Sequence, residues 1–177
     1  MGPEGTGILY ARQDCAQRLK PHRAGWLSHK EPTRFLFEGP GLLRYDKPIR
    51  SAINFVESGT QNAIGYAGLE LSIECLAQLT IPAIFAHVTH WLDALEPRLI
   101  ERGFTSARLS DPQRQSGILS VRPPHGHSVN EIATALSRAK IICSTPDGWL
   151  RFAPHWPNHS DEIPRIIDVV DAALTIH

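Results

Sequence analysis

The chain has 177 residues, 18 basic and 18 acidic side chains, and a pI near 7.1. This length fits one domain or two small ones, and 42% hydrophobic residues are enough to form a core. Zero formal net charge gives no electrostatic basis for binding nucleic acid or an anionic membrane. No stretch approaches the roughly 18 apolar residues of a membrane span, and the first residues lack a signal peptide's basic start and apolar run. We therefore expect a cytoplasmic protein.

The first 58 residues show little regular pattern. A glycine-rich turn leads into a short strand candidate at residues 7–11, and residues 12–20 are predicted to form a short helix. Residues 21–58 have neither a helical nor a strand period and contain four prolines. So long an irregular stretch is uncommon inside a compact domain. It suggests a segment that packs against something outside this sequence.

Two helices are predicted next. Asn62 can cap the first, which extends to about Leu79, and Thr80 can cap the second, with Pro82 in its first turn and Gly103 at its end. The second helix has an apolar stripe with a 3.6-residue period: Ile81, Ile84, Phe85, Val88, Leu92, Leu95 and Leu99.

The last 60 residues alternate predicted strands and helices. Ser128 opens a helix with a capping-box pattern, and Ser160 is expected to cap the final helix. The pattern predicts an α/β fold in which helices cover one face of a short sheet. The expected strands are 117–121, 141–143 and 149–152, and the expected helices are 128–138 and the segment after 160.

Histidines and cysteines form no metal site in this sequence. His87 and His90 are three residues apart but outside the apolar stripe of their helix, so a solvated face is expected. His125 and His127 lie in a Pro-rich loop without a carboxylate or thiol at ligand spacing. The three cysteines are widely spaced and suit buried thiols in a reducing compartment.

Glu57-Ser58-Gly59-Thr60-Gln61-Asn62 stands where the first long helix begins. Backbone N–H groups and the helix dipole attract an anion at such a place, and the Ser58 and Thr60 hydroxyls can donate hydrogen bonds. Gly59 allows a close approach of the backbone. The alternative is a helix cap without a ligand.

A second candidate is Arg151, which lies on a predicted strand between apolar residues. Its planar guanidinium matches the two oxygens of a carboxylate. The alternative is a structural salt bridge.

Three segments, in order, resemble the C-terminal half of a class V, fold-type-I pyridoxal-phosphate enzyme. Residues 2–10, Gly-Pro-Glu-Gly-Thr-Gly-Ile-Leu-Tyr, resemble the turn and strand that follow the family's Schiff-base lysine. Residues 57–62 are similar to its Glu-x-Gly-Thr-x-Asn motif. Residues 151–158, Arg-Phe-Ala-Pro-His-Trp-Pro-Asn, are similar to its Arg-x-Ser-Pro-His-x-x-Asn motif, with Ala153 in place of the serine.

The resemblance implies pyridoxal 5'-phosphate as cofactor and an amino acid as substrate. Ser58, Gly59 and Thr60 would contact the cofactor phosphate of a neighbouring subunit, which implies a homodimer. Arg151 would bind the substrate's α-carboxylate, with His155 and Asn158 completing the substrate site. Residues 1–79 would be the tail of the large cofactor domain, and residues 80–177 the small domain.

The resemblance also implies that the chain lacks a catalytic residue. The family's lysine lies a few residues before the Gly-Pro-x-Gly turn, and none of the lysines at 20, 30, 47 and 140 occupies that position. Only the turn of residues 144–148 separates Cys143 from the strand of Arg151, whereas the family's desulfurases carry a reactive cysteine on a loop there. We expect part of an aminotransferase or isopenicillin N epimerase-like enzyme, inactive alone, from a truncated or split gene or a misassigned start, which associates with a missing N-terminal half.

Two alternatives remain open at this point. One is a non-catalytic remnant that binds a partner protein through residues 21–58 and exposed helix faces. The other is a stand-alone anion-binding domain that uses Ser58, Gly59 and Thr60.

Overall fold

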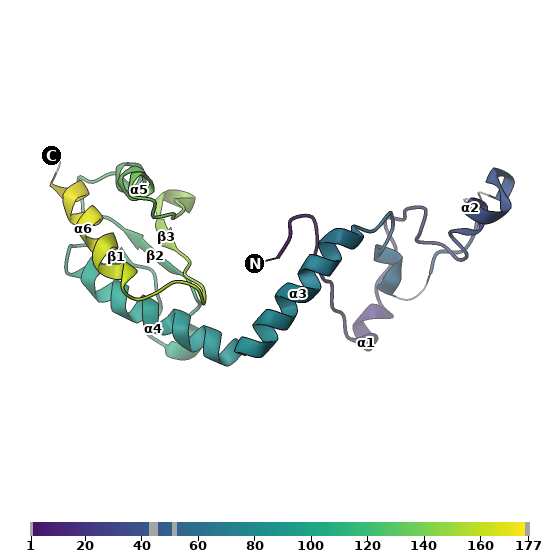
Figure 1. Cartoon of the computed structure of the whole chain (residues 1–177), viewed down its shortest axis with the longest axis horizontal. Helices are drawn as coiled ribbons and strands as arrows, with labels where there is room; N and C mark the ends of the chain where they lie inside the picture. Colours follow the sequence, from purple (N-terminus) through teal and green to yellow (C-terminus); the bar gives the residue numbers. More distant parts are fainter. Residues whose placement is uncertain (1, 43–45, 51–52, 176–177) are drawn as a thin grey trace. The chain divides into compact units, whose positions relative to one another are not determined.

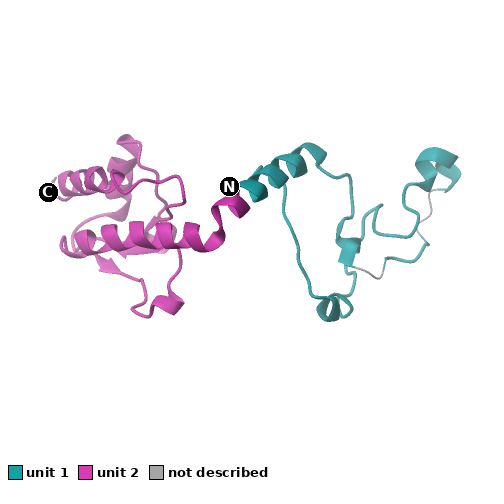
Figure 2. Ribbon diagram, turned by 60° about the horizontal axis from the view of Figure 1, so that its bottom comes forward, with its two compact units in different colours: residues 1–75 teal, residues 76–177 magenta. Residues whose placement is uncertain are grey.

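The computed structural model describes residues 2–42, 46–50 and 53–175. The chain forms two compact units, Met1–Cys75 and Leu76–His177, coloured separately in Figure 2. The division between them falls within helix α3 (Ala63–Leu79). Figure 1 labels the elements in chain order.

The first unit has short elements joined by irregular chain. The expected strand at residues 7–11 does not form, and the expected helix at 12–20 is reduced to one turn. Two contacts organise the segment after residue 21, for which the sequence showed no regular pattern. They are an antiparallel bridge between His29 and Ile49 and an edge-to-face contact of Trp26 with Phe35. The elements of this unit are α1 (Gln13–Ala16), α2 (Arg34–Glu38), η1 (Pro40–Leu42) and η2 (Ile53–Val56).

Helix α3 begins as predicted from its capping residue. The Asn62 side-chain oxygen accepts a hydrogen bond from the Gly65 amide at 3.0 Å, which satisfies one of the free N–H groups of the first turn. The helix nevertheless exposes large apolar side chains, among them Ile64 at 89% and Leu71 at 67%. Single exposed apolar residues are ordinary, but several along one helix form an exposed apolar surface.

The second long helix, α4 (Ile81–Ile100), also begins as predicted. The Thr80 hydroxyl accepts a hydrogen bond from the Ala83 amide. The inner part of the predicted stripe, from Val88 to Leu99, is buried, but Ile81 and Phe85 are exposed at 65% and 46%. The periodicity therefore located the buried face and overstated how far along the helix the core extends.

The second unit contains a three-stranded antiparallel sheet within its described residues, in the order β1 (Thr105–Ser106), β2 (Leu119–Arg122), β3 (Leu150–Phe152). Ser120 lies opposite Arg151, and Thr105 opposite Arg122. Alternation along the strands sends one set of side chains inward and Ser120, Arg122 and Arg151 outward.

Helices cover one face of this sheet, as the sequence predicted. The core gathers side chains from α4, α5 (Val129–Arg138), α6 (Glu162–Leu174) and the inner face of the sheet. The expected strand at 141–143 is wrong, because the segment 141–144 makes only an isolated bridge from Ser144 to Arg151. The short helical turns are η3 (Pro112–Arg114) and η4 (Pro146–Gly148).

No single helix in the described part of the chain is long and apolar enough to cross a membrane. Helices α3 and α4 reach the required length and apolar composition only when they are counted together across the bend between them.

Candidate functional site

The loop of Ser58, Gly59 and Thr60 is held by a close contact within the first unit. The Ser58 carbonyl accepts a hydrogen bond from the Leu27 amide at 3.2 Å. Gly25 lies so close that a Cβ there would stand 2.0 Å from the same carbonyl oxygen, so only glycine fits. Ser28, fully buried, donates to the Phe55 carbonyl at 2.7 Å. The irregular segment before the loop therefore positions it.

The hydrogen-bonding groups of this loop fit a phosphate. Ser58 and Thr60 are exposed, and neither hydroxyl has a hydrogen-bond partner among the described residues. A Cβ at Gly59 would meet nothing within 4 Å, so there is open space in front of the backbone. Two hydroxyls and a glycine backbone just before a helix supply donors to an anion without steric obstruction.

Arg151 lies on the outer face of the second unit's sheet, in a row of small polar residues. Ser120 is its cross-strand neighbour on β2, and on the other side the Arg151 amide donates to the Ser144 carbonyl at 2.8 Å. The Arg151 guanidinium is exposed and makes no ion pair or hydrogen bond with any described residue. The alternative of a structural salt bridge therefore has no acidic partner in this part of the chain.

One row along the same face, Arg122 stacks on Trp149. The Arg122 guanidinium carbon lies 4.2 Å from the centroid of the Trp149 ring, a cation–π contact. The stack fixes the Trp149 ring two residues before Arg151 on β3. This contact could not be predicted from the sequence, because it depends on the register between β2 and β3.

His155 and Asn158 lie together in the loop after β3. The His155 amide donates to the Asn158 side-chain oxygen at 2.9 Å, and the Asn158 side-chain nitrogen donates to Glu162 at 3.1 Å. Both ends of the Asn158 amide therefore stabilise the loop. Arg151 takes no part in this network, so the three residues of the predicted substrate site divide into an exposed arginine and a bonded loop.

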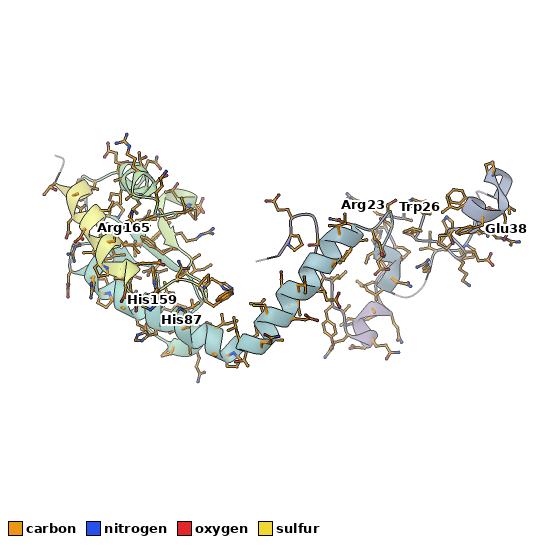
Figure 3. All side chains as sticks on the ribbon, in the orientation of Figure 1. Arg23, Trp26, Glu38, His87, His159 and Arg165 are labelled. Atoms are coloured by element: carbon orange, nitrogen blue, oxygen red, sulfur yellow. The ribbon has the colours of Figure 1, made fainter. Side chains whose placement is uncertain are left out.

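Helix α4 anchors the same loop through two side chains that sequence reasoning did not assign to it. His87 Nε2 lies 2.8 Å from the Asn158 carbonyl oxygen, and the Trp91 indole donates to the His159 carbonyl at 3.1 Å. Figure 3 labels His87 and His159 at this junction. His87 is exposed, as expected for its position on the helix, but it is bonded across 71 residues. Only the tertiary structure reveals that contact.

Cys143 is half-buried immediately before the Ser144 bridge. Burial raises the pKa of its thiol, because desolvation disfavours the thiolate. A reactive cysteine needs the opposite change, a lowered pKa and access to solvent.

The chain belongs to the aminotransferase class-V family, which matches residues 1–149. It is 28% identical over 178 residues to the uncharacterized aminotransferase YcbU of Bacillus subtilis (strain 168), covering 100% of this chain and 43% of that protein. It is 27% identical over 179 residues to a probable cysteine desulfurase of Methanothermobacter thermautotrophicus, covering 92% of this chain and 42% of that protein. The chain thus spans less than half the length of these curated relatives.

Solved structures agree on the fold. The apo structure of cysteine desulfurase from Thermococcus onnurineus NA1 superposes with a TM-score of 0.79 at 18% sequence identity, covering 99% of this chain and 44% of that chain. The helices and small antiparallel sheet therefore match part of the fold of this desulfurase structure, and the sequence predicted the short sheet covered by helices.

Proposed function

We propose that this chain is the C-terminal portion of a pyridoxal-phosphate-dependent enzyme that acts on an amino acid as a transaminase or an isopenicillin N epimerase-like enzyme. The observation that carries this proposal is Arg151, an exposed guanidinium on the outer sheet face with no partner in the described chain. Membership of the class-V family supports it.

Arg151 would bind the α-carboxylate of the amino acid. Its fork of N–H donors can take both carboxylate oxygens, and the neighbouring Ser120 and Ser144 place no competing charge beside it. Fixing the carboxylate orients the bonds at Cα. His155 and Asn158 would then support this site through the loop that follows β3.

Ser58, Gly59 and Thr60 would hold the phosphate of the cofactor from a neighbouring subunit. Their donors fit a dianion, but no basic residue stands close to them in sequence. A partner subunit would supply the remaining charge, so we infer that the active form is a homodimer. When bound, pyridoxal phosphate withdraws electrons from the bonds at the substrate's Cα.

No lysine of this chain stands at the family's Schiff-base position. We infer that residues 1–177 alone neither attach the cofactor at that position nor transfer the proton at Cα. Both tasks would fall to an N-terminal half with which this chain associates.

Cys143 supports the aminotransferase or epimerase branch over the desulfurase branch. A desulfurase needs a nucleophilic thiolate on a mobile loop, but burial raises the Cys143 pKa. Within the turn after Cys143, η4 (Pro146–Gly148) leaves no long loop before β3.

The test is reconstitution with an N-terminal half encoded in the DNA upstream of Met1, if that frame ends in His-Lys before Gly2. The reconstituted enzyme should convert an amino acid, and Arg151→Ala should raise KM at least tenfold, the loss expected for one charge-assisted pair of about 1.5–3 kcal/mol. Arg138→Ala is a matched control, since Arg138 is exposed on α5. An unchanged KM in Arg151→Ala would refute the assignment.

The exposed apolar face of α3 favours a second candidate, a non-catalytic partner-binding remnant. Ile64 and Leu71 are largely exposed on this helix. If the chain serves only as a partner-binding module, deleting residues 21–58 abolishes capture of its partner, while Arg151→Ala has no effect on it.

A further inference from the structure

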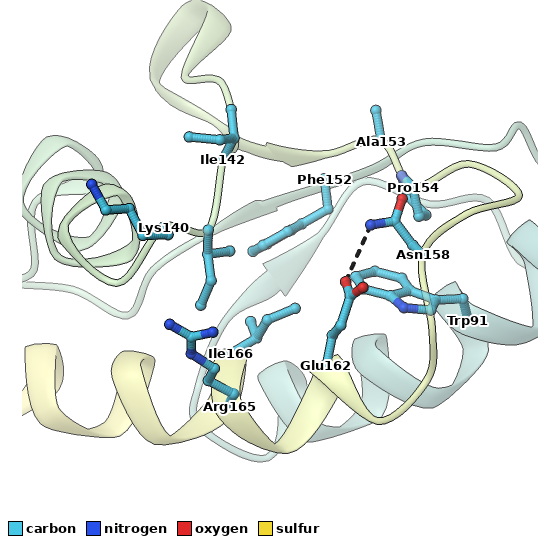
Figure 4. Close-up of a pocket in the computed structure, with 11 residues that line it drawn as sticks. Trp91, Lys140, Ile142, Phe152, Ala153, Pro154, Asn158, Glu162, Arg165 and Ile166 are labelled. Atoms are coloured by element: carbon cyan, nitrogen blue, oxygen red, sulfur yellow. Dashed lines mark hydrogen bonds between the residues drawn. The ribbon is translucent and has the colours of Figure 1, made fainter. Parts of the chain in front are cut away.

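A pocket of about 440 Å³ lies within the second unit, between the end of β3, the segment after α5 and helix α6 (Figure 4). Phe152 lines it from the inner face of β3, whereas Arg151 points to the outer face. The volume falls within the range of small-ligand pockets, about 300–1,000 Å³.

Two oppositely charged residues of α6 border this pocket without pairing with each other. Glu162 and Arg165 are three residues apart, a spacing at which an acid and a base commonly form an ion pair. No ion pair between them exists in the described structure. In Figure 4 they diverge on either side of Ile166.

Each of the two charges is held apart by other contacts. The Arg165 guanidinium donates to the Ala139 carbonyl at 2.6 Å, at the end of α5. The Glu162 carboxylate accepts from the Asn158 side chain at 3.1 Å and from the His159 amide at 3.2 Å. These bonds fix the two side chains and leave further capacity, because a guanidinium has five donors and a carboxylate about four acceptor sites.

The surface between the charges is apolar. Ile166 and Phe152 are buried at 3% exposure each, and Trp91 at 3% closes the side below Asn158. A ligand in this pocket would therefore meet the cations Arg165 and Lys140 on one side, the anion Glu162 on the other, and an apolar floor between them (Figure 4).

We propose that this pocket binds a small zwitterion of the α-amino-acid type with an apolar side chain. The ligand's carboxylate meets Arg165, its ammonium meets Glu162, and its side chain lies against Ile166 and Phe152. A purely apolar ligand would use neither charge, and an anion alone would lie beside the like charge of Glu162. The proposal does not depend on the cofactor or on Arg151.

The probe is L-leucine, with 4-methylpentanoate and isopentylamine as analogues that lack the ammonium and the carboxylate. Each is titrated into the 177-residue chain while NMR follows Ile166, Phe152 and the Trp91 indole N–H. L-leucine should shift these resonances in a saturable manner. Each analogue should bind at least about tenfold more weakly, the loss of one charge-assisted hydrogen bond.

The variants Glu162→Gln and Arg165→Gln remove one charge each, and the glutamine of the first variant keeps one acceptor oxygen for one of the two bonds that Glu162 accepts from Asn158 and His159. Each should weaken L-leucine binding about tenfold without a comparable change in the thermal midpoint. Asp168→Asn and Arg138→Gln, exposed residues outside the pocket lining, are the matched controls and should leave binding unchanged.

Three results would overturn the proposal. One is the absence of saturable shifts at Ile166 and Phe152 with L-leucine. Another is binding of either analogue as tight as that of L-leucine, which would show that one charge is not used. The third is equal binding by both charge variants and the wild type.

Discussion

Lys140 occupies a backbone position that favours glycine, so replacing it should reveal stored strain. Its φ is 62°, in the left-handed region. The Lys140 amide donates to the Ser137 carbonyl and the Ile141 amide to the Leu136 carbonyl, both at 2.9 Å. These two bonds define a Schellman motif at the end of α5, in which glycine is the usual residue. A side chain in this conformation costs about 1–2 kcal/mol.

We expect Lys140→Gly to be more stable than Lys140→Ala by about 0.5–1 kcal/mol, because glycine's extra freedom in the unfolded chain offsets part of the relieved strain. The comparison with alanine removes the Lys140 charge from both variants. For a unit of this size, the difference corresponds to about 2–8 °C in Tm. Urea unfolding followed by tryptophan fluorescence measures it. Equal stability of the two variants would refute the account of this helix end.

Three further predictions concern the second unit and the thiols. Leu95→Ala should cost about 2–5 kcal/mol in urea unfolding, because Leu95 is fully buried; a loss below 1 kcal/mol would contradict the packing. Cys143 should react with a disulfide reagent at pH 8 more slowly than the exposed Cys75, since burial raises the Cys143 pKa, and unfolding in urea should remove the difference. The hydrogen bond from Arg102 lowers the pKa of Asp171, so stability from this pair is present above about pH 4 and is lost as pH falls through the lowered pKa. Asp171→Asn should therefore flatten the fall in unfolding free energy between pH 5 and pH 2, and an unchanged slope would show that the pair contributes nothing.

Local signals predicted the long helices because their physical causes are local. Asn62 and Thr80 cap the first turns of α3 and α4, and both side chains make the expected bond to the backbone. The capping box at Ser128 placed the start of α5 correctly, although the Ser128 side chain makes no capping bond. The start of α5 therefore does not depend on a capping bond from the Ser128 side chain.

The features that the sequence did not predict depend on contacts between segments that lie apart in the chain. The two-residue strand β1 has no periodicity to detect and forms because it pairs with β2. Arg108 shows the same limit, since its side chain is 3% exposed and is bound to Asp93 and Glu96 of α4, 15 and 12 residues away. A charged residue at that position gave no sign of burial.

The residues of the candidate site were predicted from linear motifs, and the structure shows what each of them contacts. Ser58 and Thr60 keep unused hydroxyls, and Arg151 keeps an unpaired guanidinium among the described residues. Asn158 instead stabilises its own loop through two hydrogen bonds. A linear motif does not distinguish residues that bind a ligand from residues that stabilise the loop, because both kinds of residue occur at fixed positions in the motif.

The central claim, that this chain supplies phosphate and carboxylate contacts without the covalent anchor, is tested most directly by cofactor trapping. The 177-residue chain is incubated with pyridoxal phosphate, reduced with borohydride, and its lysines are mapped by mass spectrometry. The account predicts no single lysine modified to full occupancy, only low, scattered labelling. One stoichiometric pyridoxyl-lysine within residues 1–177, abolished by substituting that lysine, would contradict it.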